Sequence, residues 1–197
     1  MRVIGITGPS GSGKTVLTEY FSGLGIPTID ADALYHSMLI PPSKCLDAIS
    51  EVFGNSVIAP DGTLDRAALS SIVFSDKDKL RLLNETVLRI VIARIRELIS
   101  ELESDGHTCV LVDAPTLIEA KFDTECDTVI VVTAPQDERV HRIMNRDGIE
   151  ESRARERVMA QKPDKFYTAV ADYVINNNDG EAQFLEQIKN LAVTLSL

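Results

Sequence analysis

The stretch "GPSGSGKT", Gly8 to Thr15, follows the apolar run "VIGI" near the start of the chain and decides the fold. Five of its eight residues are Gly or Ser, and a Lys follows the last Gly. Small residues allow a backbone to wrap around a phosphate and to aim several N–H groups at it. A helical pattern begins at Lys14, and the positive end of such a helix favours the same anion. We therefore predict a phosphate-binding loop between a buried strand and a helix.

The loop also matches the pattern G-x-x-x-x-G-K-[ST] without a mismatch. In that pattern the Lys, here Lys14, reaches the β- and γ-phosphates, and the hydroxyl of Thr15 ligates Mg²⁺. The bound anion is thus predicted to be a nucleoside triphosphate, and ATP is favoured because the chain has no N-K-x-D for reading guanine. The residues predicted to bind it here are Gly8, Ser10, Gly11, Ser12, Gly13, Lys14, Thr15 and Val16.

The composition limits the classes of partner. The chain has 197 residues, 44% of them hydrophobic and 25% charged, which is typical of one globular domain. Its net charge of −10 argues against a nucleic-acid partner, because binding to a phosphate backbone requires a basic surface. There is no apolar run of membrane-spanning length and no leader-like N-terminus, and the three cysteines lack metal-site spacing. We expect no membrane association, reduced cysteines and a cytoplasmic location.

Short apolar runs alternate with helical patterns along the chain. The predicted strands cover residues 2–7, 26–30, 108–114, 127–134 and 171–177. Continuous apolar strands that alternate with helices predict a parallel sheet with both faces covered. From about residue 33 to 105 the pattern is helical only, so we predict an insertion there. It includes a long helix over 76–103, with Ser75 as its predicted cap.

Carboxylates follow the second and third predicted strands. Asp30 and Asp32, in "IDADALYH", lie at the carboxyl edge of the sheet, where ligands bind in open α/β folds. Phosphoryl transfer to a hydroxyl requires a carboxylate for the hydroxyl proton, whereas an Asp before a helix is also a common cap. We interpret one of the pair as a cap and the other as catalytic. Asp113 ends the third strand, either as a second acidic residue supporting the metal or as a strand-end cap.

Several stretches taken together resemble one family. They are "GITGPSGSGKT", "LGIPTIDADALYH", "LDRAALSSIVFSD", "VDAPTLIE", "RIMNRDGIEESRARERVMAQ" and "ADYVINN". In this order, over nearly the whole chain, they resemble the dephospho-CoA kinase family. The loop is generic, but "DAD" with a His four residues beyond and "RIMNRDG" followed by "AQ" and "ADYVINN" are far more specific.

The resemblance implies a fold and a reaction. The fold would be α/β, a three-layer P-loop NTPase fold similar to nucleoside monophosphate kinases, with a five-stranded parallel sheet. A single domain over 1–197 would contain a core of about 1–32 and 106–197, a helical acceptor-binding insertion of about 33–105, and a small helical lid of about 139–161. The enzyme would transfer the γ-phosphate of ATP to the ribose 3′-hydroxyl of dephospho-CoA, in the last step of coenzyme A synthesis.

The matched positions also imply roles for single residues. Asp32 would be the base, and Lys14 and Arg142 would stabilise charge. Arg146 would belong to the lid, and its four-residue spacing from Arg142 puts both on one helix face; Arg139 and the other nearby arginines fit a solvated helix face. The remaining implied contacts are ATP with Arg142 and with Asn177, which would approach the adenine site, the acceptor with Asp32, His36, Asp113 and Pro115, and Mg²⁺ with Thr15 and Asp30. From the residues alone, His36 could also be a surface or capping histidine.

The chain departs from the family pattern in several places. "VLR", Val87 to Arg89, stands where the family usually carries His-Pro, and "PTLIE" stands for "PLLFE". Arg139 replaces a Gln three residues before Arg142, and Tyr167 replaces a Lys, with Lys162 and Lys165 nearby. These departures concern acceptor contacts more than the class of reaction.

Two other hypotheses remain open at the level of sequence. The chain could be another small-molecule P-loop kinase that acts on a nucleoside, a nucleotide or a shikimate-like acceptor. It could also be a non-catalytic nucleotide-binding regulator that has kept the fold, although the intact set of Lys14, Thr15, Asp32 and Arg142 argues against that. We expect a monomer or a weak homo-oligomer.

Overall fold

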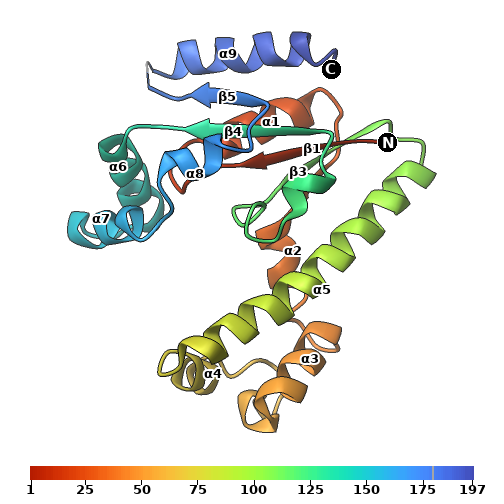
Figure 1. Ribbon diagram of the computed structural model, residues 1–197, viewed down its shortest axis with the longest axis vertical. Coiled ribbons are helices and arrows are strands. Elements are labelled where there is room, and N and C mark those ends of the chain that lie inside the picture. Colours follow the sequence, from red (N-terminus) through yellow and green to blue (C-terminus); the bar gives the residue numbers. More distant parts are fainter. Residues whose placement is uncertain (179) are drawn as a thin grey trace. The chain divides into compact units, whose positions relative to one another are not determined.

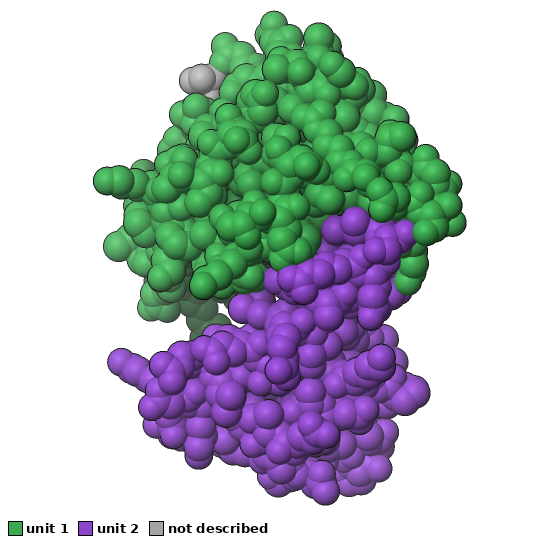
Figure 2. Space-filling model, turned by 45° about the vertical axis from the view of Figure 1, so that its right-hand side comes forward, with its two compact units in different colours: residues 1–29, 101–197 green, residues 30–100 purple. Residues whose placement is uncertain are grey.

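The computed structural model divides into two compact units with separate cores (Figures 1 and 2). The structure describes residues 1–178 and 180–197. The first unit consists of residues 1–29 and 101–197, and the second of residues 30–100. Each unit is built around its own set of buried apolar side chains.

A five-stranded sheet organises the first unit. Its strands are β1 (Arg2–Thr7), β2 (Thr28–Asp30), β3 (Cys109–Asp113), β4 (Thr128–Thr133) and β5 (Tyr173–Asn176). Their order is β2-β3-β1-β4-β5, and β1 runs parallel to both β3 and β4. The predicted parallel α/β sheet is thus confirmed. From β1 the chain continues to β2 at one edge of the sheet, and from β4 it continues to β5 at the other edge. A topological switch point therefore lies between β1 and β4.

Helices and a folded loop cover the two faces of this sheet. Helices α1 (Lys14–Gly23) and α9 (Glu181–Thr194) pack on one face, where Phe21 and Phe184 meet the strand residues Ile4 and Leu111. On the other face Gly5 leaves room for the segment 114–126, because a Cβ there would lie 2.7 Å from Cys126 Sγ. This segment includes the 3-10 helix η2 (Phe122–Glu125), and helix α8 (Asp164–Thr168) packs nearby against β4 (Figure 1). The unit therefore has three layers.

The segment predicted to be a lid forms a helical hairpin. It contains α6 (Gln136–Asp147) and α7 (Glu151–Met159), and α6 ends at Gly148 in the left-handed conformation. The two helices pack through a small apolar cluster of their own, formed by Val140, Ile143, Ala154 and Val158.

The second unit is helical. It contains α2 (Ala31–Ser37), α3 (Lys44–Phe53), the 3-10 helix η1 (Asn55–Val57), α4 (Arg66–Val73) and most of α5 (Lys77–Ser104). Cys45, Ile49 and Val57 are fully buried in its core, and Val87 and Ile90 of α5 pack against them. Neither α5 nor any other helix in the two described ranges is both long enough and apolar enough to cross a membrane.

The long helix begins one residue later than the sequence predicted. Asp76 caps it, because its Oδ1 accepts the backbone N–H groups of Asp78 at 2.9 Å and Lys79 at 3.2 Å. Ser75 instead donates its hydroxyl to the carbonyl groups of Ser71 and Ile72, at the end of α4. The prediction of Ser75 as the cap was therefore wrong. Ser and Asp are both good caps, but the Ser75 hydroxyl is already bonded to carbonyl groups at the end of α4.

All three cysteines are free thiols, as predicted from their spacing. Burial, together with a smaller effect of the nearby carboxylate of Asp123, raises the pKa of the Cys126 thiol to about 12. The thiol donates to the carbonyl oxygen of Phe122 at 3.3 Å. Cys126 is therefore a protonated packing residue at neutral pH.

Candidate active site

The phosphate-binding loop lies at the switch point of the sheet, between β1 and α1. Gly13 stands at the N-cap of α1 with φ 105°, and no side chain caps the helix there. The first turn of α1 also contains no acidic residue. The positive end of the helix is thus left for an anion, as the sequence predicted.

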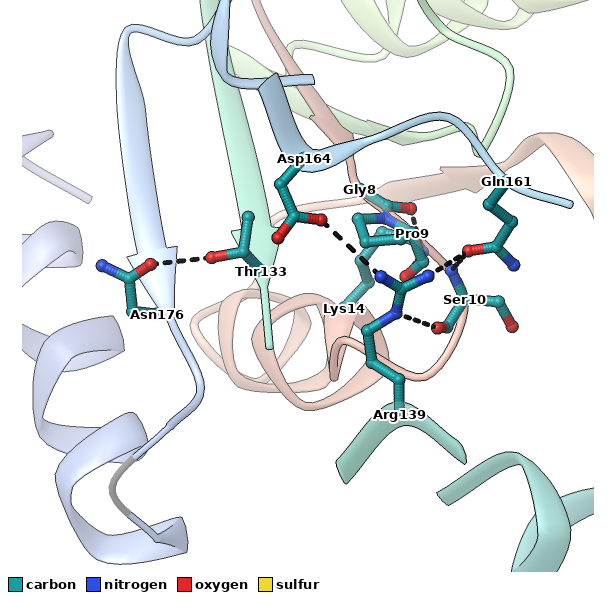
Figure 3. A network of polar contacts seen from close by, with 9 residues as sticks. All are labelled: Gly8, Pro9, Ser10, Lys14, Thr133, Arg139, Gln161, Asp164 and Asn176. Atoms are coloured by element: carbon teal, nitrogen blue, oxygen red, sulfur yellow. Dashed lines mark hydrogen bonds and ion pairs between the residues drawn. The ribbon is translucent and has the colours of Figure 1, made fainter. Parts of the chain in front are cut away.

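Lys14 folds back over the start of the loop. Its Nζ donates to the carbonyl oxygen of Gly8 at 2.8 Å and to that of Pro9 at 3.4 Å (Figure 3). The ammonium group therefore lies beside the backbone of its own loop, where a bound phosphate would also be within its reach.

The next three carbonyl groups of the loop accept hydrogen bonds from side chains distant in sequence. Arg139 Nε donates to Ser10 O at 3.1 Å, and Arg142 donates to the carbonyl oxygens of Gly11 at 3.1 Å and Ser12 at 3.2 Å. All carbonyl groups from residue 8 to 12 are thus held by donors. Because a carbonyl oxygen aimed at a phosphate would repel it, this arrangement favours an anion at the loop.

Asn177, the residue after β5, supports the same loop. Its side chain is buried, and its Nδ2 donates to Ser12 O at 2.9 Å. The preceding residue, Asn176, accepts from the Thr133 hydroxyl at 2.7 Å through its side chain. The family resemblance implied that Asn177 lies at the adenine site; in the structure its amide nitrogen contacts the phosphate-binding loop itself.

Gly13 offers a direct test of the loop geometry. A Cβ at Gly13 would lie 2.4 Å from Asn177 Nδ2, and φ is strained for any other residue. We expect Gly13→Ala to destabilise the fold by about 1–3 kcal/mol and to weaken ATP binding roughly tenfold or more. Thermal unfolding and calorimetric ATP titration measure the two effects.

The matched control is Gly23→Ala at the last residue of α1, where a Cβ would meet nothing within 4 Å. That change should leave ATP binding unchanged and stabilise the helix slightly, by up to about 1 kcal/mol. Equal behaviour of the two variants would contradict the tight approach of Asn177 to Gly13.

Arg139 is not a solvated residue, and the prediction that it belongs to a solvated face was wrong. It is 2% exposed, and burial lowers the pKa of its guanidinium while the carboxylate of Asp164 opposes that shift. A signal was present in the sequence, because Arg139 precedes Arg142 by three residues and so shares its helix face. Gln161, whose Oε1 accepts the Ser10 N–H at 3.0 Å, was not predicted as a loop contact either.

Arg146 lies one turn beyond Arg142 on α6. Its side chain is 60% exposed, and it bonds to Asp147 through Nε at 2.7 Å while one terminal nitrogen lies 3.4 Å from Ser10 Oγ. The hydrogen bond with Asp147 raises the pKa of Arg146 and lowers that of the carboxyl group. Arg142 and Arg146 share one helix face, as their spacing predicted, and the structure brings both to the loop.

The two aspartates of "IDAD" have different roles in the structure. Asp30 caps α2, because its Oδ1 accepts the N–H groups of Asp32 and Ala33, both at 2.9 Å. Asp32 lies in the first turn of α2 with its side chain exposed, and His36 follows one turn later, also exposed. The cap in the pair is therefore Asp30, which leaves Asp32 as the candidate base.

The other predicted acceptor residues belong to the first unit. Asp113 ends β3 opposite Ile6 of β1, and Pro115 accepts the Thr7 hydroxyl at 3.5 Å through its carbonyl group. Tyr167, which departs from the family pattern, is buried, and burial raises its pKa. Within the described residues, no three His, Cys, Asp or Glu side chains gather in a group that could hold a metal ion.

The glycine-rich loop lies at the switch point of a parallel sheet, and arginines of α6, the helix after β4, bond to its carbonyl groups. This combination is typical of P-loop phosphotransferases. The model of the dephospho-CoA kinase family matches residues 2–183, and the chain belongs to that family. It is therefore an ATP-using kinase, a transferase of the last step of coenzyme A synthesis.

Known proteins agree with this assignment. A dephospho-CoA kinase of Carboxydothermus hydrogenoformans is 36% identical, over 95% of this chain and 91% of its own length. A crystal structure of a protein from Thermus thermophilus has a TM-score of 0.81 at 32% identity and covers 100% of this chain and 97% of its own. Dephospho-CoA kinase from Campylobacter jejuni has a TM-score of 0.72 at 25% identity, with coverage of 100% and 98%.

Proposed function

We propose that the chain transfers the γ-phosphate of ATP to the ribose 3′-hydroxyl of dephospho-CoA and releases coenzyme A and ADP. The observation that carries this proposal is the extent of the family match. It runs over residues 2–183 and so includes the phosphate-binding loop, the "IDAD" stretch and helix α6.

The loop and the start of α1 would hold the triphosphate. Lys14 and Arg142 would offset the charge that develops on the transferring phosphate. Support comes from their positions, since both side chains already contact the backbone of the loop. Arg146, exposed and one turn further along α6, would approach the phosphates from the lid.

Mg²⁺ fits this site as an ion held largely by the nucleotide. It binds few protein oxygens when phosphates are present, so a cluster of carboxylates is not required. The Thr15 hydroxyl in the first turn of α1 would be one ligand, and Asp30 would contribute the carboxylate oxygen that does not cap α2. When bound, the ion neutralises charge on the phosphate oxygens.

Asp32 would act as the base. Its carboxylate would take the proton of the 3′-hydroxyl as that oxygen attacks the γ-phosphorus, and the bond to the leaving ADP oxygen would break. His36, one turn along the same face of α2, would contact the acceptor together with Asp113 and Pro115. The exposure of Asp32 supports this role, since a base must reach its substrate.

A cytoplasmic location and a monomeric or weakly oligomeric state belong to the same proposal. The three free thiols support a reducing compartment. Sedimentation at several protein concentrations would measure the oligomeric state.

Product analysis tests the reaction. The protein is incubated with ATP and Mg²⁺ and one acceptor at a time: dephospho-CoA, AMP, adenosine or shikimate. We expect ADP and a phosphorylated product with dephospho-CoA alone, and phosphorus–proton coupling in the nuclear magnetic resonance spectrum should place the phosphate on the 3′-oxygen. Turnover of another acceptor in preference would identify a different small-molecule kinase, and ATP binding without any turnover would identify a regulator.

A further inference from the structure

Arg139 carries a buried charge that the reaction does not use. Each nitrogen of its guanidinium has a partner: Nε donates to Ser10 O at 3.1 Å, one terminal nitrogen to Gln161 Oε1 at 2.6 Å, and the other lies 3.6 Å from Asp164 Oδ1 (Figure 3). Burying a guanidinium is costly unless it is paired and hydrogen-bonded. Each of the three nitrogens thus has a partner within the protein, and the side chain is held by the fold itself.

The contacts of Arg139 and Gln161 converge on one residue of the loop, Ser10. Ser10 donates its N–H to Gln161 Oε1 at 3.0 Å and accepts Arg139 Nε at its carbonyl oxygen. Gln161 Oε1 thus receives two donors, one from Ser10 and one from Arg139. The two side chains come from α6 and from the segment after α7, 129 and 151 residues away in the sequence.

This double contact distinguishes Ser10 from the other residues of the loop. The carbonyl group of Gly11 is held by Arg142 and that of Ser12 by Arg142 and Asn177, two residues that are both predicted to contact ATP as well. Ser10 is instead held at both its N–H and its C=O by two side chains that have no role in the proposed reaction. The N–H of Ser10 lies in the peptide plane before its Cα and the C=O in the plane after it, so fixing both groups holds two successive peptide planes. The second plane also contains the N–H of Gly11, whose direction is therefore set by the same contacts.

We propose that Arg139 and Gln161 are positioning residues that hold the Ser10 backbone in its phosphate-binding orientation, so that the loop is formed before the nucleotide arrives. This inference rests on the proposed binding of ATP at the loop. An ordered loop does not have to lose conformational freedom on binding, which increases the affinity for the nucleotide.

Two variants of Gln161 separate positioning from mere packing. Gln161→Met has a similar size but no acceptor, whereas Gln161→Glu keeps an oxygen for both donors. We expect the Kd for ATP, measured by calorimetry without any acceptor, to rise roughly 10- to 100-fold in Gln161→Met. Gln161→Glu should stay within about threefold of the original protein, because Arg139 compensates its charge.

Arg139→Met tests the same proposal at the second residue, again through the Kd for ATP. Each of the two residues has a matched control variant. The controls are Gln183→Met on the exposed side of α9 and Arg155→Met, whose side chain forms ion pairs at the surface of α7. Neither control touches the loop, so both should bind ATP normally. In the double variant of Arg139 and Gln161 the loss should be smaller than the product of the two single losses, because both act through Ser10.

The two measurements, the Kd for ATP and the KM values, test the positioning role separately from the proposed reaction. The Kd for ATP is independent of the acceptor, so it decides the role of the pair even if dephospho-CoA is not phosphorylated. In turnover assays the KM for ATP should rise while the KM for dephospho-CoA stays unchanged. An unchanged Kd in Gln161→Met with a lowered unfolding temperature, or equal losses in Gln161→Met and Gln161→Glu, would overturn the proposal.

Discussion

Replacing Lys14 with alanine is expected to reduce kcat by roughly 100- to 1,000-fold, because it removes a charged donor from the transferring phosphate. The Nζ atom lies beside the loop, 2.8 Å from Gly8 O, and not in the apolar core. The fold should therefore survive the substitution. Steady-state kinetics with saturating ATP, together with thermal unfolding, measure both parts of this expectation.

The control for Lys14 is Lys189→Ala on the exposed side of α9. It removes the same charge from a surface distant in sequence from the loop, and kcat should not change. If a folded Lys14→Ala protein turned over at nearly the original rate, phosphoryl transfer at this loop would have to be abandoned as the function.

Asp32→Asn is expected to lower kcat by roughly 100- to 10,000-fold while the KM for ATP changes little. The substitution is nearly isosteric and removes only the negative charge and the proton acceptor. Asp32 is exposed in the first turn of α2, so its loss should not disturb packing. Initial rates at saturating ATP, Mg²⁺ and dephospho-CoA give kcat, and a titration of ATP gives its KM.

Asp30→Asn is the matched comparison for Asp32→Asn. Asn also caps helices, so its Oδ1 should still accept the N–H groups of residues 32 and 33 and α2 should keep its start. We expect a milder loss of kcat and a larger change in the Mg²⁺ dependence. A more severe loss in Asp30→Asn than in Asp32→Asn at saturating Mg²⁺ would reverse the assignment of base and metal ligand.

Short-range sequence patterns, each spanning only a few residues, were enough to predict the loop, the strands and the shared face of two arginines. The loop from Gly8 to Thr15 was predicted because its spacing is short and each position has a physical requirement, and the structure places it between β1 and α1. The strands were predicted from continuous apolar runs, and the parallel sheet follows from their alternation with helices. The shared face of Arg142 and Arg146 is likewise a local property, since residues four apart are neighbours on a helix.

Which aspartate of "IDAD" caps the helix depended on where the backbone turns. Both residues are good caps by type, so residue type could not separate them. Asp30 has φ −88° and ψ 110°, an extended conformation, and helix α2 begins at the next residue. Its carboxylate therefore faces the free N–H groups of the first turn, which leaves Asp32 within the helix. The same reasoning applies to Ser75 and Asp76 at the start of α5.

The sequence by itself thus determined the loop, the sheet and the family, whereas the tertiary structure alone decided which side chains hold the loop in place. Arg139 lies in a charged stretch whose composition is typical of a solvated helix, yet its side chain is buried because α6, the helix after β4, brings it to Ser10. Gln161 and Asn177 reach the same loop from 151 and 165 residues away. No local pattern encodes such contacts, because the partner of a polar side chain across that separation is set by how the strands and helices pack.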